Sequence, residues 1–567
     1  MLVFILAIDT ALACGGLLGP TRDGVTQSSQ EVAFQIDEAA NQTTMHVQVH
    51  FKAPDDSIAW IVPVQGIPDV FRSHADLFQR LGAATRPTFP IDGVLDASCP
   101  DYQVPNIHQA TGDHPTSTFS WYHDTGTPDP DPVLVLDADR IGPYEVTTLA
   151  ADDTEALTDW LTVHGYRVPQ TLDDTLAPYV DTGMNFVAIQ LAKEVNHHSG
   201  TLPPLAFRYE GTTPVLPLQL TRLAAPLDMP MTVYIIGEHR GVPLNTRHVR
   251  LNARAIDTFG DIRGGNLDDV VRRAADEAGG HAFATLAAIE DPRFTPLVYQ
   301  PDAYDPESLH GLTDAVDFVL ALPAAGFVLT PEVVAALAPY FPLPSNIQPG
   351  SEGMFYSDPE RFRDDFDAFV FDPVDVSDSL VEHVIVPRMT AQTLLDNVPY
   401  LTRLHSSFSP GEMTVDPEFG VNPDLPPVYP RQPVEVLFAC DETDGERARK
   451  SPQLITWLTG QQLWLPSLAE MTATRTLYVD YISLDVPAAL TIEQMSTSGP
   501  PEVLYDYSVE PTTPPQTGDT ASDDTAAEPS GGDAAGASGC GCQAANAPAS
   551  LGLLAGLLGW MRRRRAA

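Results

Sequence analysis

The first part of the chain alternates apolar and polar residues with the period of a β-strand. In residues 45–51, Val47, Val49 and Phe51 share one face, and polar side chains share the other. Residues 58–64 form an almost unbroken apolar run, which is typical of a strand covered on both faces. Both segments are therefore predicted to be strands.

Similar patterns continue to about residue 255, where they are interrupted by a few helices. Further strands are expected at residues 133–136, 144–149 and 234–237. A hairpin is expected to join residues 187–191 to residues 205–209 through a turn at 196–200. Helices are expected from Ser73 to Gly82 and from Asp152 to Gly165.

Helical spacing becomes commoner after residue 255. One helix is expected at residues 267–278, ended by Gly279 and Gly280. A second is expected to begin after a cap at Thr330, and a third to span residues 391–404 with a break at Pro399. Strands are expected again at residues 434–438 and 475–482. The pattern predicts an α+β protein, mostly antiparallel β in its first half and more helical in its second.

The N-terminal segment has the features of an export signal. Residues 1–13 are short and apolar and end in Ala11, Leu12 and Ala13, the small-x-small pattern of a signal-peptidase site. Asp9 interrupts the apolar run, and no basic residues precede it. Cys14 follows directly, so simple cleavage and a lipoprotein whose lipid is attached to Cys14 both remain open. The plainer interpretation of residues 1–13 is a buried N-terminal strand.

The C-terminal segment has three parts. Residues 508–539 are rich in Pro, Thr, Ser, Gly, Asp and Ala, which predicts a disordered acidic linker. Cys540 and Cys542 follow, then an apolar run from Ala544 to Met561 and four arginines. The run has 18 residues, about 27 Å of helix, which is slightly short of a typical hydrocarbon core. The arginines would stay cytoplasmic and leave the body outside.

This tail resembles the MYXO-CTERM sorting tails of myxobacteria. The resemblance implies processing near Cys540 or Cys542 by an envelope sorting protease and display on the cell surface. The expected organisation starts with a signal peptide at residues 1–13, a β-rich domain at 14–255 and an α+β domain at 256–507. An acidic linker at 508–539 and a sorting or membrane-anchor tail at 540–567 follow.

Composition limits the partners of the body. The 567 residues are 43% apolar, enough for a sizeable core, and 76 acidic residues against 31 basic ones give a net charge of −45. Such a surface repels nucleic acid and anionic lipid, so no nucleic-acid partner is expected. The expected partners are the membrane, through the tail, and an unidentified extracellular ligand.

Export predicts that the cysteines of the body are oxidised. The candidates are Cys14, Cys99 and Cys440. A bond between Cys14 and Cys99 is expected, because both lie in the first β-rich part. If Cys14 carries lipid, the pairing of Cys99 with Cys440 is the alternative.

The body also resembles a bacterial family of unknown function, the domain-of-unknown-function family numbered 2330. The resemblance rests on segments spread over about residues 13–430: Ala13–Gly16, Ala59–Val64, Gly142–Val146, Asp159–Leu161, Gly183–Met184, Ala278–Phe283, Tyr400–Leu404 and Asn422–Pro426. Members often carry a second cysteine five residues after the first, where this chain has Gly19. The resemblance implies export and supplies no activity.

Motifs for chemistry are scarce. The sequence has no nucleophile elbow, zincin helix, Walker loop or dinucleotide fingerprint. His46 and His50 would lie about 13 Å apart on a strand, too far to share one metal. No cofactor is predicted. Calcium near Asp441, Asp444 and Glu446 is left open, although their spacing is not that of an EF-hand. A metal at His197 and His198 is also left open, with a solvated turn as the plainer interpretation.

His281 is the main candidate for a binding residue. It follows two glycines at a predicted helix end, where the backbone can approach a ligand closely. The plainer interpretation is a histidine packed beside Phe283. Taken together, the sequence predicts an exported, surface-anchored protein that binds, adheres or acts as a scaffold rather than an enzyme. The alternative is an envelope hydrolase whose site is assembled only in the fold.

Overall fold

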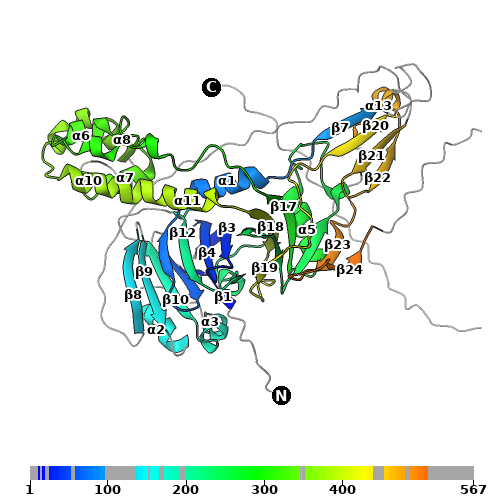
Figure 1. The fold of residues 1–567 in the computed structure, drawn as a ribbon, viewed down its shortest axis with the longest axis horizontal. Helices are drawn as coiled ribbons and strands as arrows, with labels where there is room; N and C mark the ends of the chain where they lie inside the picture. Colours follow the sequence, from blue (N-terminus) through cyan, green and yellow to red (C-terminus); the bar gives the residue numbers. More distant parts are fainter. Residues whose placement is uncertain are drawn as a thin grey trace, which may run out of the picture. The chain divides into compact units, whose positions relative to one another are not determined.

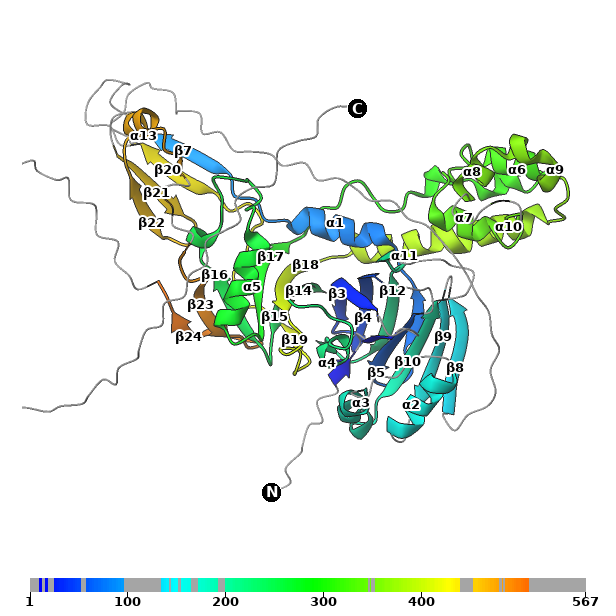
Figure 2. The same cartoon turned by 180° about the vertical axis from the view of Figure 1, so that it is seen from behind.

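A computed structural model provides the fold (Figure 1; Figure 2 gives the view from behind). The structure describes residues 10–12, 16–18, 25–52, 58–95, 134–141, 144–150, 154–164, 172–191, 199–344, 347, 352–438, 452–478, 482 and 485–508. All of them belong to one compact unit, Met1–Pro514. The chain is α+β, as predicted, and most strand pairs are antiparallel.

An eleven-stranded sheet is the largest element of the fold. In spatial order its strands are β24 (Glu502–Asp506), β23 (Ala489–Gln494), β16 (Arg247–Leu251), β17 (Ala282–Glu290), β18 (Tyr400–Phe408), β14 (Met229–Gly237), β3 (Thr26–Asp37), β4 (Gln42–Lys52), β12 (Leu205–Glu210) and β6 (Asp69–Arg72). β11 (Ser199–Thr201) also pairs with β4. The pairs β14–β3 and β16–β17 are parallel. The sheet thus joins strands from both ends of the sequence.

A second sheet packs against one face of the first. Its five strands are β2 (Gly16–Leu18), β5 (Ala59–Val64), β10 (Asn185–Leu191), β9 (Tyr144–Ala150) and β8 (Leu134–Ile141). Trp60 and Val62 of β5 enter the core shared with the large sheet, while Ala59 and Ile61 pack with α2 (Thr154–Val163) and α3 (Leu172–Asp181). Burial on both faces explains the apolar run and confirms that prediction.

Two helices cover the opposite face of the large sheet, α1 (Ala75–Thr85) and α11 (Val386–Asp396) (Figure 1). The structure corrects two helix predictions here. α1 is capped by His74 and continues through Gly82, because Leu81 and Thr85 extend its buried face. The helix expected at 391–404 ends at Asp396, and the residues after Pro399 form strand β18.

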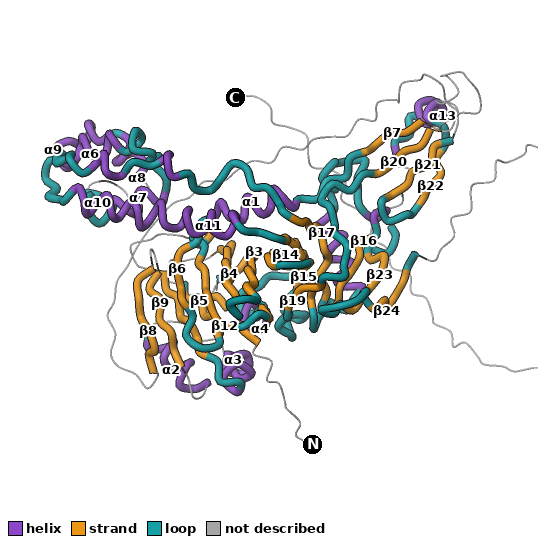
Figure 3. Tube along the Cα trace, in the orientation of Figure 1, coloured by secondary structure: helices purple, strands orange, loops and turns teal. Residues whose placement is uncertain are grey.

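Most of the remaining helices are α5 (Leu267–Glu277), which packs on the large sheet, and a separate second group (Figure 3). α5 packs on β16, β17 and β23, and Gly279 and Gly280, both with positive φ, end it as predicted. The second group has an aromatic-rich core of its own. Its α-helices are α6 (Ala315–Ala321), α7 (Pro331–Leu337), α8 (Glu352–Ser357), α9 (Arg363–Phe366) and α10 (Pro373–Leu380), and Thr330 caps α7 as expected.

Three small sheets complete the fold. β22 (Gln462–Leu465), β21 (Gln453–Trp457), β20 (Val434–Phe438) and β7 (Ile91–Leu95) form one; β15 (Arg240–Pro243) pairs with β19 (Phe419–Asn422), and β1 (Thr10–Leu12) pairs with β13 (Thr213–Val215). The short helices α4 (Leu218–Thr221) and α13 (Leu468–Thr474) also occur. The strand expected at 475–482 is wrong: Arg475 is left-handed at the end of α13, and 476–478 are not extended into a ladder.

The expected hairpin between residues 187–191 and 205–209 is also wrong. β10 pairs with β5 and β9, whereas β12 pairs with β4 and β6 in the other sheet. Alternation identified both strands correctly but could not identify their partners. Strands from both sides of the domain boundary expected at residue 256 share the large sheet, and that boundary stays a prediction.

Candidate functional site

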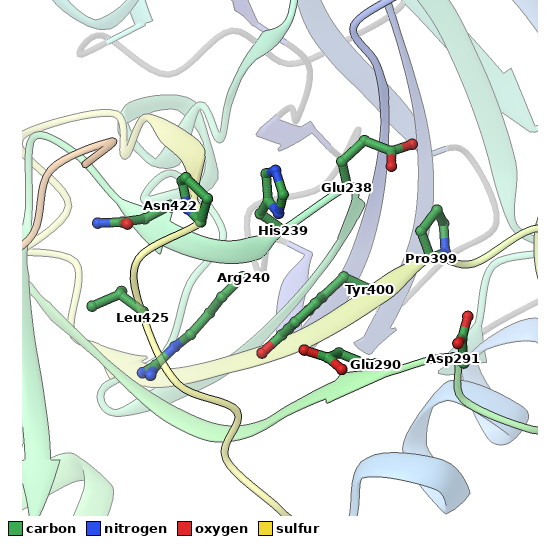
Figure 4. Close-up of a pocket in the computed structure, with 10 residues that line it drawn as sticks. Glu238, His239, Arg240, Glu290, Asp291, Pro399, Tyr400, Asn422 and Leu425 are labelled. Atoms are coloured by element: carbon green, nitrogen blue, oxygen red, sulfur yellow. The ribbon is translucent and has the colours of Figure 1, made fainter. Parts of the chain in front are cut away.

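A pocket of about 230 Å³ opens where four chain segments meet (Figure 4). Glu238 and His239 form the turn between β14 and β15, and Arg240 begins β15; Glu290 ends β17, and Asp291 follows it. Tyr400 begins β18, and the chain that leaves β19 completes the lining. The pocket is therefore a product of the large sheet and the small β15–β19 ladder that crosses it.

Gly241 is the residue that lets β15 cross so closely. A Cβ at this position would lie 2.5 Å from the Cβ of Ile235 on β14, closer than two such atoms can approach. Its backbone N–H also donates to the Thr402 hydroxyl of β18 at 2.8 Å. The missing side chain and this hydrogen bond fix the position of the neighbouring Arg240 over the sheet.

Arg240 is the buried cation of the site, with only 7% of its surface exposed. Nη1 donates to the backbone oxygen of Pro426 at 3.0 Å, and Nη2 donates to the Thr285 hydroxyl at 3.3 Å. Nε has no hydrogen-bond partner within the described residues. Burial lowers the pKa of Arg240, while Tyr400 and Glu493 oppose that shift. Arginine nevertheless remains charged at neutral pH.

Tyr400 provides a second unused donor. Its side chain is 6% exposed, and its hydroxyl has no partner in the described part of the chain. Burial raises the pKa of Tyr400, and Arg240 opposes the shift. In Figure 4 the Tyr400 side chain is drawn between those of Arg240 and Glu290, and both of these charges influence its pKa. Both residues line the pocket.

A hydrogen-bonded array continues from Arg240 into the sheet. The Thr285 hydroxyl lies 2.9 Å from His248 Nε2, and His248 Nδ1 lies 3.0 Å from Glu493 Oε2. The other Glu493 oxygen accepts from the Thr491 hydroxyl at 2.7 Å. Because a carboxylate only accepts, Nδ1 carries the proton of His248, and Thr285 donates to Nε2 while it accepts from Arg240.

Both ionisable groups of this array have shifted pKa values. Burial lowers the pKa of His248, although its hydrogen bond to Glu493 acts in the opposite direction. Burial alone would raise the pKa of Glu493, but its hydrogen bonds to His248 and Thr491 leave it below the usual value. At neutral pH the array therefore contains a neutral imidazole and an ionised carboxylate.

A second array of the same residue classes lies elsewhere on the sheet. The Thr232 hydroxyl of β14 is 2.9 Å from His405 Nδ1 on β18, and His405 Nε2 is 3.6 Å from the carboxylate of Asp268 on α5. Asp268 is 89% exposed as a side chain, whereas Glu493 is 4% exposed. The second array has no arginine in its hydrogen bonds and does not reach the pocket.

The structure places His281 outside the pocket. The imidazole is half-buried, with Nδ1 3.1 Å from the Gly279 oxygen and Nε2 2.9 Å from the Thr414 hydroxyl. Its role as a binding residue stays a prediction. His46 contacts the Ser73 hydroxyl, and His50 lies 3.8 Å from Glu31.

Several predicted residues lie outside the described residues, among them Cys14, Cys99, Cys440, Cys540, Cys542, Asp441, Asp444 and Glu446. Within the described ranges, no group of three histidine, cysteine or acidic side chains could hold a metal ion. None of the helices in that part of the chain has the length and hydrophobicity of a membrane span. The apolar run at 544–561 is not among the described residues.

Sequence reasoning did not identify Arg240, His248, Thr285 or Glu493. Glu493 lies 245 residues from its partner His248, so no local motif contains the array. The one available signal was the run Gly237–Gly241, in which two glycines enclose three charged or titratable residues between apolar strands. Such a run marks a turn where side chains can be directed towards a ligand.

Comparisons with known proteins give one extended match. A family model described as "Uncharacterized protein conserved in bacteria (DUF2330)" matches residues 8–295, which include Arg240, His248 and Thr285. No curated protein matches the sequence. Among solved structures, baculovirus P35 is 10% identical over 41% of this chain and 68% of its own, with a TM-score of 0.21. A score that low carries no argument about fold or function.

Proposed function

The chain belongs to the family of uncharacterised proteins conserved in bacteria (DUF2330), and we propose that it is an exported protein held at the cell envelope, where it binds a small charged molecule. The pocket at Arg240 is the proposed binding site. The protein acts as a binding module, and the ligand stays chemically unchanged.

One observation carries this proposal: two residues that line the same pocket each have a buried donor that lacks a partner in the described chain. Arg240 Nε and the Tyr400 hydroxyl are both buried and unpaired within the described chain. A buried polar group that lacks a partner costs about 1–3 kcal/mol, so a ligand that accepts from both donors would recover that free energy. Carboxylate and phosphate oxygens are the acceptors that arginine binds best.

The proposed location at the cell envelope rests on the sequences of the two ends of the chain. In the structure β1 pairs with β13, so signal-peptidase cleavage after Ala13 would remove a strand of the fold. The tail from Cys540 would be processed near Cys540 or Cys542 by an envelope sorting protease, and the new end would hold the protein at the membrane. The acidic linker at 508–539 would let the body extend from the surface.

Deletion of residues 540–567 tests the anchoring. We expect the deleted protein to be released into the medium in folded form. Mass spectrometry of surface-attached wild type should detect no peptide that contains Trp560. A mature protein that retains Trp560 would instead make the tail a permanent membrane anchor. A deletion variant that stays bound to cells would move the anchor elsewhere, to lipid on Cys14.

Ligand binding is tested with a panel of small anions: acetate, succinate, hexanoate and inorganic phosphate. Binding to purified protein would be measured by calorimetry and by the rise in melting temperature. Arg240→Lys keeps the positive charge but loses the planar guanidinium group. It should therefore lower the affinity for every anion of the panel that the wild type binds. Arg431→Lys, at an exposed arginine paired with Asp92, is the matched control. Equal binding by Arg240→Lys and wild type would reject the pocket.

The second candidate function is an envelope hydrolase. The Thr285–His248–Glu493 array favours it, because a hydroxyl, an imidazole and a carboxylate in sequence are the components of a nucleophilic triad. However, Arg240 donates to the Thr285 oxygen that would have to attack a substrate. We therefore assign the array the role of positioning Arg240.

A further inference from the structure

The charges around the pocket are arranged in two layers. The buried wall contains the Arg240 cation and the Tyr400 hydroxyl, each more than nine-tenths buried and each with a free donor in the described chain. The exposed lining contains three carboxylates, Glu238, Glu290 and Asp291. Three negative charges therefore surround an opening above one positive charge.

This arrangement disfavours ligands that carry only one kind of charge. A simple carboxylate would gain the Arg240 contact but would be repelled by the three acidic groups at the opening. A simple amine would be attracted to the opening but would leave both buried donors without an acceptor. A molecule with both groups can place its carboxylate against Arg240 and its ammonium beside Glu290 or Asp291.

Two further observations narrow the ligand. At about 230 Å³ the pocket is smaller than those that hold drug-sized molecules, which begin near 300 Å³. The three carboxylates do not form a metal site, because no metal-holding group of acidic, histidine or cysteine side chains exists among the described residues. A small organic cation fits the acidic opening better than an ion that needs several direct ligands.

From these observations we infer that the pocket binds a small zwitterion, a molecule with a carboxylate and an ammonium group, of the size of a free amino acid. The inference rests on the proposed function and specifies the ligand class of the same pocket. Arg240 and Tyr400 bind the carboxylate, and Glu290 and Asp291 bind the ammonium group. Glu238 contributes to the negative potential at the opening.

Four probes with related carbon chains test the inference on the full mature chain. Norleucine and 6-aminohexanoate carry both groups in different spacings, hexanoate lacks the ammonium group, and pentylamine lacks the carboxylate. We expect at least one zwitterion to bind about tenfold more tightly than hexanoate and pentylamine, since each added charge pair near a protein surface changes affinity by roughly that factor. Calorimetry at low ionic strength measures all four affinities.

Variants at the opening separate the inference from the proposed function. Glu290→Gln and Asp291→Asn should each lower the affinity for the zwitterion severalfold. Their affinity for hexanoate should equal or exceed that of the wild type. Glu307→Gln, at an exposed residue of the helical group, should change neither affinity. If hexanoate binds as tightly as both zwitterions and Arg240→Lys weakens all three, the zwitterion inference is overturned while the proposed pocket stands. If the small-anion panel binds but no zwitterion does, the inference is likewise overturned.

Discussion

Two arrays of threonine, histidine and a carboxylate involve the same large sheet. They differ in the burial of the carboxylate and in whether the threonine contacts an arginine. Thr285, His248 and Glu493 are joined by hydrogen bonds of 2.9 and 3.0 Å, and the acid is almost completely buried. In the other array the acid, Asp268, is largely in solvent and lies 3.6 Å from His405. Only the buried array ends on an arginine that lines a pocket.

The difference shows that the residue classes alone do not define a functional site. A buried histidine needs partners for both ring nitrogens, and threonine with a carboxylate is one common way to satisfy them. In the second array Thr232 is the partner of His405 Nδ1, while His405 Nε2 and Asp268 are 3.6 Å apart, farther than a hydrogen bond. In the buried array the same chemistry also determines the direction of the Thr285 hydroxyl, and therefore leaves its oxygen free to accept from Arg240.

The largest expected difference between the arrays is in stability. Glu493→Gln removes a buried carboxylate that accepts from His248 and Thr491, so the free energy of unfolding should fall by about 2–4 kcal/mol. Asp268→Asn changes an exposed partner and should cost less than about 1 kcal/mol. Urea unfolding of both variants at pH 7 measures the contrast. Similar losses in the two variants would mean that burial of the acid does not distinguish the arrays.

The next largest difference is expected when the threonine hydroxyl of each array is removed. Thr285→Val leaves Arg240 Nη2 and His248 Nε2 without a partner, which predicts a loss of about 1–3 kcal/mol in stability and about tenfold in ligand affinity. Thr232→Val should cost about 1 kcal/mol and leave affinity unchanged. Calorimetry with the tightest probe gives the affinities. Equal affinities for the two variants would contradict the positioning role of Thr285.

Local patterns were sufficient to predict a segment where its apolar residues recur along the sequence with a simple period or form an unbroken run. The helix at 267–277 and the doubly buried strand at 59–64 were predicted because their apolar residues recur at 3.6 residues or run unbroken. Residues 400–404 were predicted as helix, yet they form β18. Tyr400, Leu401 and Leu404 also fit helical spacing, and only the neighbouring strands β14 and β17 decide the outcome.

The candidate site depended on contacts that no local pattern contains. Arg240 meets Thr285 across 45 residues, and His248 meets Glu493 across 245. The family resemblance included Tyr400 and Asn422, which line the pocket, but it gave them no role. The sequence could suggest a turn at 237–241; it could not indicate that β15 crosses the sheet and buries an arginine there.

A third, half-buried acid, Asp416, sharpens the comparison, because it has no basic partner among the residues that the structure describes. Asp416 accepts from the Tyr179 hydroxyl at 2.7 Å and from the Gln219 N–H at 3.0 Å, and burial raises its pKa to about 6. The folded state therefore favours the protonated form. The stability from this group is complete below the unfolded pKa near 4 and is lost as the pH rises through 6.

Asp416→Asn should remove this pH dependence. The variant should be more stable than wild type at pH 7 by about 1–2 kcal/mol, and the difference should disappear near pH 4. Thermal unfolding from pH 4 to pH 8 measures it, with the exposed Asp364→Asn as control. A variant that is less stable than wild type at pH 7 would show that hydrogen bonds to the ionised carboxylate outweigh its burial.

The smallest expected effect is on hydrolysis, where the two arrays should behave alike. If Thr285 were a nucleophile, His248 would take its proton and the oxygen would attack an ester carbonyl. In the structure that oxygen accepts from a buried cation, which lowers its nucleophilicity, and Thr285 is not among the residues that line the pocket. Cleavage of p-nitrophenyl acetate should therefore be equal for wild type, Thr285→Val and Thr232→Val. A rate that falls a hundredfold or more in Thr285→Val alone, a typical size for loss of a catalytic group, would assign the buried array to catalysis and make the hydrolase the better interpretation.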